Sequence, residues 1–360
     1  MGFPVTVVLG ASGRIGRVLR HCWRQDLPQS PQSARLNPPL DQDRQAQETL
    51  PPPQIRWQSR SQLAPGSETE TTCQLDPLAD PAGLAQLMHG ADLVLCLAGS
   101  IPGRGGDLAD NSRLALASLE AAARAAETTG APAARVLLSS SAAVYGNQSG
   151  LLSEASPLHP ANAYGAAKME MERQALARGQ QLGVPVTALR IGNIAGLDAI
   201  LGGWKPGFCL DQFADHRSPR RSYIGPKTLA QTLARLLATP GACPDLPQVL
   251  NLAQPRALEM AALLRASDLP FAWRPAPQTA IAEVELDLSR LQHVLQGSPL
   301  SQDWHGGALE PAEAGQMLAE WAEIEPVLTG NPQRLTDPSQ RDRPVRNPMQ
   351  NHTKNKEPHS

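Results

Sequence analysis

Cysteine, lysine and aromatic residues are all scarce in this chain of 360 residues, and aromatic residues make up only 4% of it. The five cysteines are scattered and form no Cys-x-x-Cys pair; they are Cys22, Cys73, Cys96, Cys209 and Cys243. This spacing argues against a disulfide framework or a zinc site and favours reduced thiols, so we expect a cytoplasmic protein. The eight histidines show no metal-ligand spacing either, and no metal site is expected.

The chain also lacks a strong charge of one sign and any long apolar run. Its formal net charge is −2, which gives no electrostatic basis for binding nucleic acid or an anionic membrane. No run approaches the roughly 18 apolar residues of a membrane helix. The N-terminus enters the apolar stretch Val5–Leu9 without a basic segment and cleavage site, so we expect no signal peptide. The expected partner is therefore a small molecule.

Short apolar runs alternate with helical patterns along most of the chain. Strands are expected at 5–9, 54–59, 92–98, 135–139, 186–191 and 249–252, and helices from residue 15 and around 84–88, 111–128, 163–178, 228–238 and 312–324. Repeated alternation of strand and helix with short connections predicts an α/β fold built on a doubly wound parallel sheet.

A glycine-rich turn follows the first apolar run and opens the first helical pattern. Its residues are Gly10, Ala11, Ser12, Gly13, Arg14, Ile15 and Gly16. Gly10 permits a tight turn, Gly13 lets the backbone approach a pyrophosphate, and Gly16 lets the helix and strand pack closely. The start of the helix then presents free N–H groups and the positive end of its dipole to phosphate. This context predicts a dinucleotide-binding sheet of the Rossmann type.

A loosening of the pattern near residue 200 predicts two lobes. Residues 1–200 are expected to form the NAD(P)-binding Rossmann domain, and residues 201–329 a small substrate-binding lobe that is partly interleaved with it. Residues 28–53 are rich in proline, glutamine and aspartate and are expected to be a flexible insertion. Residues 330–360 lack apolar periodicity, which predicts a disordered tail.

The end of the second expected strand bears on the choice of cofactor. NAD-binding domains usually carry an acidic residue there, which bonds the adenine ribose. Here the strand ends Trp57-Gln58-Ser59-Arg60, without an acid. The guanidinium of Arg60, with Ser59 and assistance from Arg14, is suited instead to hold a 2′-phosphate. We therefore expect NAD(P) as the cofactor and favour NADP(H) over NAD(H).

Tyr164 and Lys168 stand four residues apart, on one face of an expected helix. With three tyrosines and five lysines in the chain, this spacing is expected by chance only roughly 0.04 times. A fixed ammonium favours the phenolate and lowers the pKa of a tyrosine, so that Tyr164 can act as general acid or base toward a carbonyl or alcohol. Ser141 stands just past a strand end, where open α/β sheets bind ligands, and offers a hydroxyl. We predict Ser141, Tyr164 and Lys168 as the catalytic residues.

Taken together, these features resemble the extended short-chain dehydrogenase/reductase family, and within it the NAD-dependent epimerase/dehydratase group. The resemblance covers roughly residues 4–260 and rests on the glycine turn, Leu75-Asp76, Leu97-Ala98-Gly99, Asn111, the serines ending at Ser141, the Tyr164/Lys168 pair and Leu189–Gly196. It implies an oxidoreductase or epimerase that transfers hydride between NAD(P) and a carbonyl or alcohol of a sugar or nucleotide-sugar-like substrate, with Tyr164 as general acid and base.

The resemblance also implies contacts with the cofactor for individual residues. Asp76 would contact the adenine. Leu97, Ala98 and Gly99 would line the ribose and phosphate side of the cofactor, and Asn111 would line the same cleft. Tyr164 would lie beside the cofactor, and Lys168 would also hold the nicotinamide ribose.

Two residues are candidates for binding the substrate. Asn193 follows a strand end and is similar to a substrate-side position of the family. Arg221 begins the segment Arg221–Lys227, which resembles a family segment that often carries an acidic pair; here Gly225-Pro226-Lys227 stands in its place. Arg221 either contacts a phosphate of a nucleotide-sugar or belongs to a solvated basic cluster.

Alternative functions stay open. A reductase or dehydrogenase and an epimerase that returns its hydride are both compatible with the sequence, whereas Ala142 and Ala143 after Ser141 argue against a dehydratase. A second class is a non-catalytic NAD(P)-binding sensor or assembly factor on the same fold, although such proteins commonly lose the Tyr–Lys pair. A homodimer is also compatible with the sequence.

Overall fold

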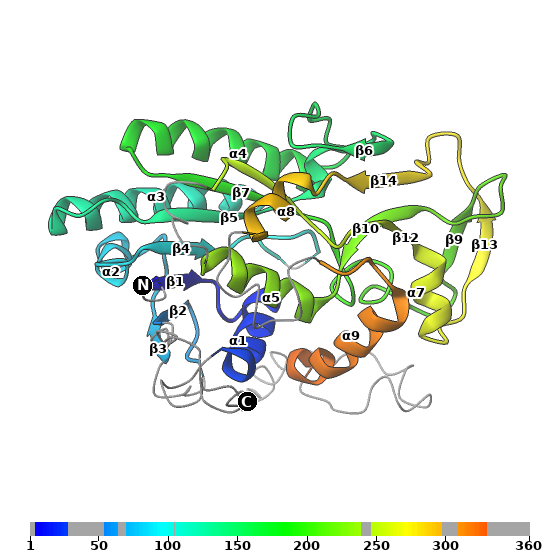
Figure 1. The fold of residues 1–360 in the computed structure, drawn as a ribbon, viewed down its shortest axis with the longest axis horizontal. Helices are drawn as coiled ribbons and strands as arrows, with labels where there is room; N and C mark the ends of the chain where they lie inside the picture. The colour runs from blue at the N-terminus through cyan, green and yellow to red at the C-terminus, as the bar shows by residue number, and fades with distance from the viewer. Residues whose placement is uncertain are drawn as a thin grey trace, which may run out of the picture.

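The structure is a computed structural model, and it describes residues 4–27, 54–63, 70–103, 105–238, 246–296 and 309–329. Figure 1 shows how the helices and strands are arranged. The expected flexible insertion at 28–53 and the expected disordered tail at 330–360 lie outside the described residues, so both stay predictions.

Seven parallel strands form the main sheet, in the order β11-β7-β5-β4-β1-β2-β3. They are β1 (Thr6–Leu9), β2 (Ile55–Ser59), β3 (Glu70–Gln74), β4 (Leu93–Cys96), β5 (Arg135–Ser141), β7 (Val186–Ile191) and β11 (Val249–Leu252). From β1 the chain adds strands first on one side and then on the other, which is the doubly wound order of a Rossmann-type sheet. The carboxyl ends of all these strands therefore lie along one edge of the sheet.

Helices cover both faces of the main sheet (Figure 1). α1 (Arg14–Asp26) and α5 (Pro226–Leu237) pack on one face, and α2 (Pro81–Leu87), α3 (Asp110–Thr129) and α4 (Ala163–Leu182) pack on the other. Because side chains alternate along a strand, Val8 joins the core under α1 and α5, while Val7 and Leu9 join the core under α3 and α4. Burial on both faces explains why these strands read as continuous apolar runs.

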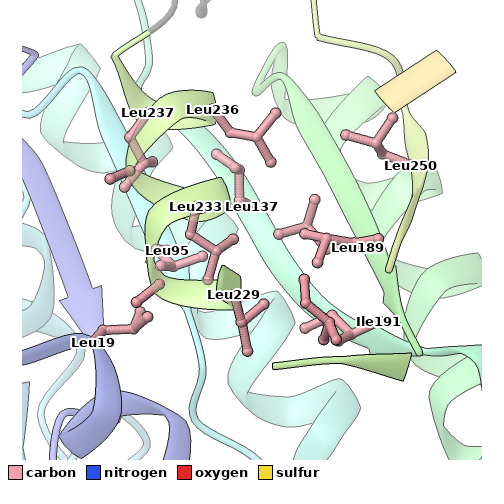
Figure 2. Packing of buried hydrophobic residues seen from close by; sticks show 14 of the residues in the cluster. Leu19, Leu95, Leu137, Leu189, Ile191, Leu229, Leu233, Leu236, Leu237 and Leu250 are labelled. Carbon is pink, nitrogen blue, oxygen red and sulfur yellow. The ribbon is translucent and has the colours of Figure 1, made fainter. Parts of the chain in front are cut away.

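The leucines of α5 form the centre of the core on its side of the sheet. They recur at the spacing of one helix face, and Figure 2 shows them pointing toward apolar residues of α1, β4, β5, β7 and β11. The residues that meet there are Leu229, Leu233, Leu236 and Leu237 of α5 with Leu19, Leu95, Leu137, Leu189, Ile191 and Leu250. Each leucine buried in this way contributes about 1.5–3 kcal/mol to the stability of the fold.

The second lobe is built around β10 (Arg220–Ile224). β10 pairs with β12 (Ala257–Glu259) and with β14 (Glu283–Leu286), β14 pairs with β6 (Gly150–Leu152), and β8 (Asn193–Ile194) pairs with the end of β10; β9 (Cys209–Gln212) and β13 (Ala272–Pro275) form a separate two-stranded ribbon. The remaining elements are the 3-10 turn η2 (Ala142–Val144) and the helices α7 (Met260–Ala266), α8 (Ser289–Gln296) and α9 (Ala314–Thr329). β6 and β8 precede residue 200 and β11 follows it, so each sheet takes strands from both sides of that residue. The division into two domains stays a prediction.

The expected fold class is confirmed, and each expected strand and helix occurs within a few residues of its expected place. The strands that sequence analysis missed are β3 and those of the second lobe. β3 (Glu70–Gln74) has mostly exposed side chains and no apolar run. The second-lobe strands are short, so periodicity has little length over which to show itself.

A glutamate of α9 caps the start of α5. α5 begins after Gly225, which has no side chain to accept the free N–H groups of the first turn. The buried carboxylate of Glu320 accepts the N–H of Lys227 and of Thr228, each at 2.9 Å, and the Thr228 hydroxyl at 2.6 Å. The first turn of α5 contains no acidic residue of its own. Glu320 of α9 supplies the carboxylate there instead, at the end of α5 where the helix dipole favours a negative charge.

Replacing Glu320 by alanine should lower the free energy of unfolding by about 1–3 kcal/mol, because two N–H groups and a hydroxyl lose their acceptor. Glu323→Ala is the matched control. On the same helix, Glu323 forms an exposed ion pair with Lys227 at 2.9 Å, and its loss should cost less than about 1 kcal/mol. Chemical denaturation of the two variants checks this, and equal costs would contradict the capping role.

Candidate active site

The glycine turn lies between β1 and α1, at the carboxyl edge of the main sheet. Gly10 has φ +87°, and a Cβ there would lie 2.8 Å from the backbone nitrogen of Ala98. A Cβ on Gly16 would overlap the carbonyl oxygen of Gly10. α1 then begins after Gly13, with no side-chain cap and no acidic residue in its first turn. The turn therefore fits a dinucleotide, because its backbone is bare and its helix dipole faces the cleft.

Gln58 braces this turn, although sequence analysis gave it no role. Its side chain is buried within β2, where Oε1 accepts the Gly10 N–H at 2.9 Å and Nε2 donates to the Leu75 carbonyl at 2.7 Å. Its own carbonyl accepts the Ala11 N–H. One residue thus joins the glycine turn to the segment that leads into Asp76. A glutamine directly after the buried Trp57 was the available signal, since buried polar groups need partners.

The residues expected at the adenine end lie near one another. Ser59 is the last residue of β2 and is buried, with its hydroxyl accepting the Ser61 N–H at 3.1 Å. Arg60 follows it and is exposed. Asp76 follows β3, which pairs with β2, and its carboxylate accepts the Leu78 N–H at 2.9 Å, which shapes the local turn.

Arg14 does not join this group. Its Nη1 donates to the Leu197 carbonyl at 3.0 Å, on a loop beyond the far end of β7. Arg14 is the first residue of α1, and this bond directs its side chain toward the loop after β7. The expectation that Arg14 assists Arg60 at a 2′-phosphate stays a prediction.

Lys168 closes the inner wall of the cleft. Its Nζ donates to the Ser139 carbonyl at 2.6 Å, and only 4% of the residue is exposed. A Cβ on Gly99 would lie 3.6 Å from this Nζ and 2.5 Å from Oδ1 of Asn111. The buried Asn111 amide is itself held by both backbone groups of Ser100. The structure thus brings together Lys168, Asn111 and the segment after β4, which are Leu97, Ala98 and Gly99.

Tyr164 enters the site from the first turn of α4. Asn162 caps that turn by accepting the Gly165 N–H at 2.9 Å. Gly165 lets α4 approach η2, because a Cβ there would overlap the Ala143 carbonyl. As a result the side chains of Tyr164 and Ser141 share a hydrogen bond, and the Lys168 ammonium lies 5.9 Å from the centre of the Tyr164 ring. The three expected catalytic residues are therefore neighbours.

The pKa of Tyr164 is raised, whereas the sequence predicted that it would be lowered. Burial raises this pKa above its ordinary value, while the hydrogen bond with Ser141 and the charge of Arg14 act to lower it. Lys168 is not among the groups that lower it; its ammonium donates to the Ser139 carbonyl and lies 5.9 Å from the centre of the ring. Burial also lowers the pKa of Lys168 to about 8, against the opposing charge of Glu172.

A cavity of about 350 Å³ opens beside this group, between the start of α4 and the second lobe. Its lining includes Asn147, Asn162, Asp211, Arg221 and Thr279. The guanidinium of Arg221 is held by backbone carbonyls, at 2.7 Å from that of Arg220 and 2.9 Å from that of Ile281, and burial lowers its pKa. Arg221 is therefore a fixed, partly buried cation, and a contact between it and a ligand phosphate stays a prediction.

Asn193 lies in β8, where it pairs with Tyr223 of β10, two residues after Arg221. It is half-buried at the junction between the main sheet and the second lobe. Tyr223, the residue with which Asn193 pairs, therefore lies on the same strand as Arg221, the cation that lines the cavity.

A buried polar network lies beneath these residues. Arg190 of β7 and Glu172 of α4 form an ion pair at 2.7 Å, with side chains 5% and 3% exposed. The Ser140 hydroxyl donates to Glu172, and Arg190 donates to the Tyr145 hydroxyl at 3.1 Å. Tyr145 in turn donates to Asn251 of β11 at 2.6 Å. Sequence analysis missed this network; the signal for it was the acid one helical turn after Lys168.

The features of this edge of the sheet together indicate one class of protein. The bare glycine turn, the Tyr164, Ser141 and Lys168 group and the cavity share the carboxyl edge of a doubly wound sheet, where such sheets bind ligands. They have the arrangement of a dinucleotide-binding fold with a candidate active site at this edge.

The chain belongs to the NAD dependent epimerase/dehydratase family, whose model matches residues 6–200. It is therefore a member of an enzyme family. No curated protein matches the chain at the level of sequence.

Solved structures share the fold across most of the chain. MoeE5 in complex with UDP-glucuronic acid and NAD has a TM-score of 0.60 and 19% identity, covering 89% of this chain and 98% of its own. UDP-glucuronic acid 4-epimerase from Bacillus cereus in complex with NAD has a TM-score of 0.61 and 17% identity, covering 91% and 98%. UDP-N-acetylglucosamine 4-epimerase from Methanobrevibacter ruminantium M1 has a TM-score of 0.58 and 18% identity, covering 92% and 100%.

Two further findings concern the described part of the chain alone. No helix in it has the length and apolar character needed to cross a membrane. Within the same residues, no group of three or more histidine, cysteine, aspartate or glutamate side chains is arranged to hold a metal ion.

Replacing Lys168 by methionine should change stability in a pH-dependent way. Because burial lowers the pKa from 10.5 to about 8, the folded protein binds fewer protons than the unfolded chain between these pH values. The cost of burying the ammonium is therefore full below about pH 8 and disappears as the pH rises toward 10.5. The unfolding free energy of Lys168→Met minus that of the wild type should be largest near neutral pH and should fall over this range.

Urea denaturation at roughly pH 7 and pH 10 measures this difference. The matched control is Lys205→Met, at an exposed lysine, which should follow the wild type at both values. A difference between Lys168→Met and the wild type that does not change with pH would contradict the lowered pKa.

Proposed function

We propose that the chain binds NAD(P) along the carboxyl edge of the main sheet and catalyses hydride transfer at a hydroxyl or carbonyl of a sugar nucleotide. The observation that carries the proposal is the convergence of Tyr164, Ser141 and Lys168 between the bare glycine turn and the cavity. When bound, the nicotinamide takes up or returns the hydride.

The chain's own residues handle the proton. Tyr164 accepts the proton of the substrate hydroxyl as the carbonyl forms, and it donates the proton in the reverse direction. Ser141, which shares a hydrogen bond with Tyr164, donates to the same substrate oxygen and holds it against the phenol. The charge of Arg14 favours the phenolate form of Tyr164. The ammonium of Lys168, fixed at the Ser139 carbonyl, is available to ribose hydroxyls.

The second lobe supplies the features that favour a sugar nucleotide. Arg221 presents a cation held by carbonyls at the wall of the cavity, and a guanidinium matches the geometry of a phosphate. Asn147, Asn162 and Thr279 offer hydrogen bonds for sugar hydroxyls in the same cavity. The neighbours solved with UDP-sugars support this choice of substrate class. A net oxidation and an epimerisation use the same proton transfer at Tyr164.

Tyr164→Phe should lower turnover about 100- to 10,000-fold, because the proton donor and acceptor is removed. Dinucleotide affinity should stay close to that of the wild type. Hydride transfer with a panel of nucleoside diphosphate sugars and fluorescence titration with NADH and NADPH measure the two quantities. Tyr145→Phe is the matched control, because within the described residues the Tyr145 hydroxyl bonds to the framework residues Asn251 and Arg190. It should lower stability and keep most of the turnover.

Normal turnover by Tyr164→Phe would overturn the mechanism. A wild-type protein that binds NAD(P) but transfers hydride to and from no member of the panel would favour the non-catalytic sensor instead.

We further propose a preference for NADP(H), supported by Ser59 and the exposed Arg60 at the end of β2. Arg60→Ala should weaken NADPH binding roughly tenfold to a hundredfold, the value of a lost charge-assisted hydrogen bond. NADH binding serves as the internal control and should not change. Equal affinities of the wild type for NADH and NADPH, unaffected by the substitution, would favour NAD, the cofactor carried by the solved neighbours.

A further inference from the structure

Arg14 connects two segments that lie far apart in the sequence. It is the first residue of α1, at the end of the glycine turn. Its Nη1 donates to the carbonyl of Leu197 at 3.0 Å, 183 residues further along the chain. Leu197 lies in the loop that follows β7 and β8, which leads into the second lobe. The contact therefore joins the cofactor turn to the substrate side of the molecule.

The position of this contact follows from the order of the strands. β1, which precedes Arg14, and β7, which precedes Leu197, are separated in the sheet by β4 and β5. Neighbouring strands lie about 4.8 Å apart, so β1 and β7 are about 14 Å apart. Arg14 and the Leu197 loop thus reach toward each other across the carboxyl ends of β4 and β5. A dinucleotide on a sheet of this kind lies along the same ends.

The acceptor at Leu197 is itself held firmly. The Leu197 N–H donates to the Ile194 carbonyl at 2.9 Å. The neighbouring Asp198 carboxylate accepts the Leu201 N–H at 3.0 Å and the Tyr223 hydroxyl at 3.0 Å. Tyr223 is fully buried in β10, two residues from Arg221. The loop is therefore a fixed anchor for Arg14 and is continuous with the substrate lobe.

Arg14 also lies close enough to Tyr164 for its charge to lower the pKa of the phenol. The groups that face Tyr164 are Arg14 from α1, Ser141 from β5 and Lys168 from α4. Since Lys168 turns to the Ser139 carbonyl, the guanidinium of Arg14 is the cation that favours the phenolate in this arrangement.

We infer that Arg14 is a positioning residue that closes the cofactor cleft. Its guanidinium bridges the glycine turn to the Leu197 carbonyl beside Tyr164 and thereby slows the release of a bound nicotinamide dinucleotide. The inference rests on the proposed function, because it requires that the cleft binds a dinucleotide. Retention of the cofactor is what an enzyme needs if it removes a hydride and returns it in the same cycle.

The test compares Arg14→Met, Arg14→Lys and a control in the full-length protein. Arg17→Met is the matched control, because Arg17 lies on the same helix but donates to the carbonyls of Val327 and Leu328 at the end of α9. The release rate of NADH and NADPH is measured by stopped-flow fluorescence with excess unlabelled nucleotide as trap. The pH dependence of hydride transfer and the thermal stability without nucleotide are measured on the same variants.

Arg14→Met should release the dinucleotide about tenfold faster or more, the value of one hydrogen bond to a charged group. It should also move the pH limb of hydride transfer that belongs to Tyr164 to higher pH. Arg14→Lys keeps the charge and should fall between Arg14→Met and the wild type. Arg17→Met should lose stability and release the dinucleotide at the wild-type rate.

Release from Arg14→Met at the wild-type rate would overturn the inference, and so would an equal acceleration in Arg17→Met, which would indicate a general loosening of α1. Failure of the proposed function is a distinct result, since the wild-type protein would then either bind no dinucleotide or bind it without transferring hydride, and neither result depends on the release rates of the variants.

Discussion

The buried ion pair between Glu172 and Arg190 is the interaction on which the active site depends. Glu172 follows Lys168 by one helical turn on α4, so the pair that fixes α4 against β7 also fixes Lys168 against Ser139. Charges this deeply buried are costly unless all their hydrogen bonds are satisfied. Here the hydroxyls of Ser140 and Tyr145 complete the set. The arrangement gives orientation more than stability, because an apolar pair of the same volume would not define the angle of α4.

The same network reaches the second lobe. Tyr145 donates to the Asn251 side chain, whose Nδ2 donates to the carbonyls of Leu152 in β6 and Asp287 after β14. The buried Glu154 carboxylate accepts the Asn251 N–H at 2.9 Å, so its role is in this framework. Since β14 pairs with β10, which carries Arg221, a chain of hydrogen bonds and strand pairings connects the catalytic helix with the wall of the cavity.

The main sheet could be predicted from the sequence because its central strands β1 and β4 are buried on both faces and read as apolar runs. The glycine turn and the Tyr164–Lys168 spacing are local patterns, so they too could be predicted. The directions of Arg14 and Gln58 could not, since they depend on the order of strands in space. The bond from Glu320 to the start of α5 joins residues 92 and 93 positions apart, beyond the reach of any periodicity.

The cations of the site are held differently from those of the framework. Arg190 and Arg20 each pair with a buried carboxylate, Glu172 and Glu70. Lys168 and Arg221 are held by backbone carbonyls, and neither forms an ion pair within the described part of the chain. A carbonyl dipole orients a cation without cancelling its charge, so Lys168 and Arg221 each keep a charge to offer a ligand. In the proposed function these are separate roles: Arg221 attracts the phosphates of a sugar nucleotide, Lys168 is available to the cofactor ribose, and the charge of Arg14 favours the phenolate of Tyr164.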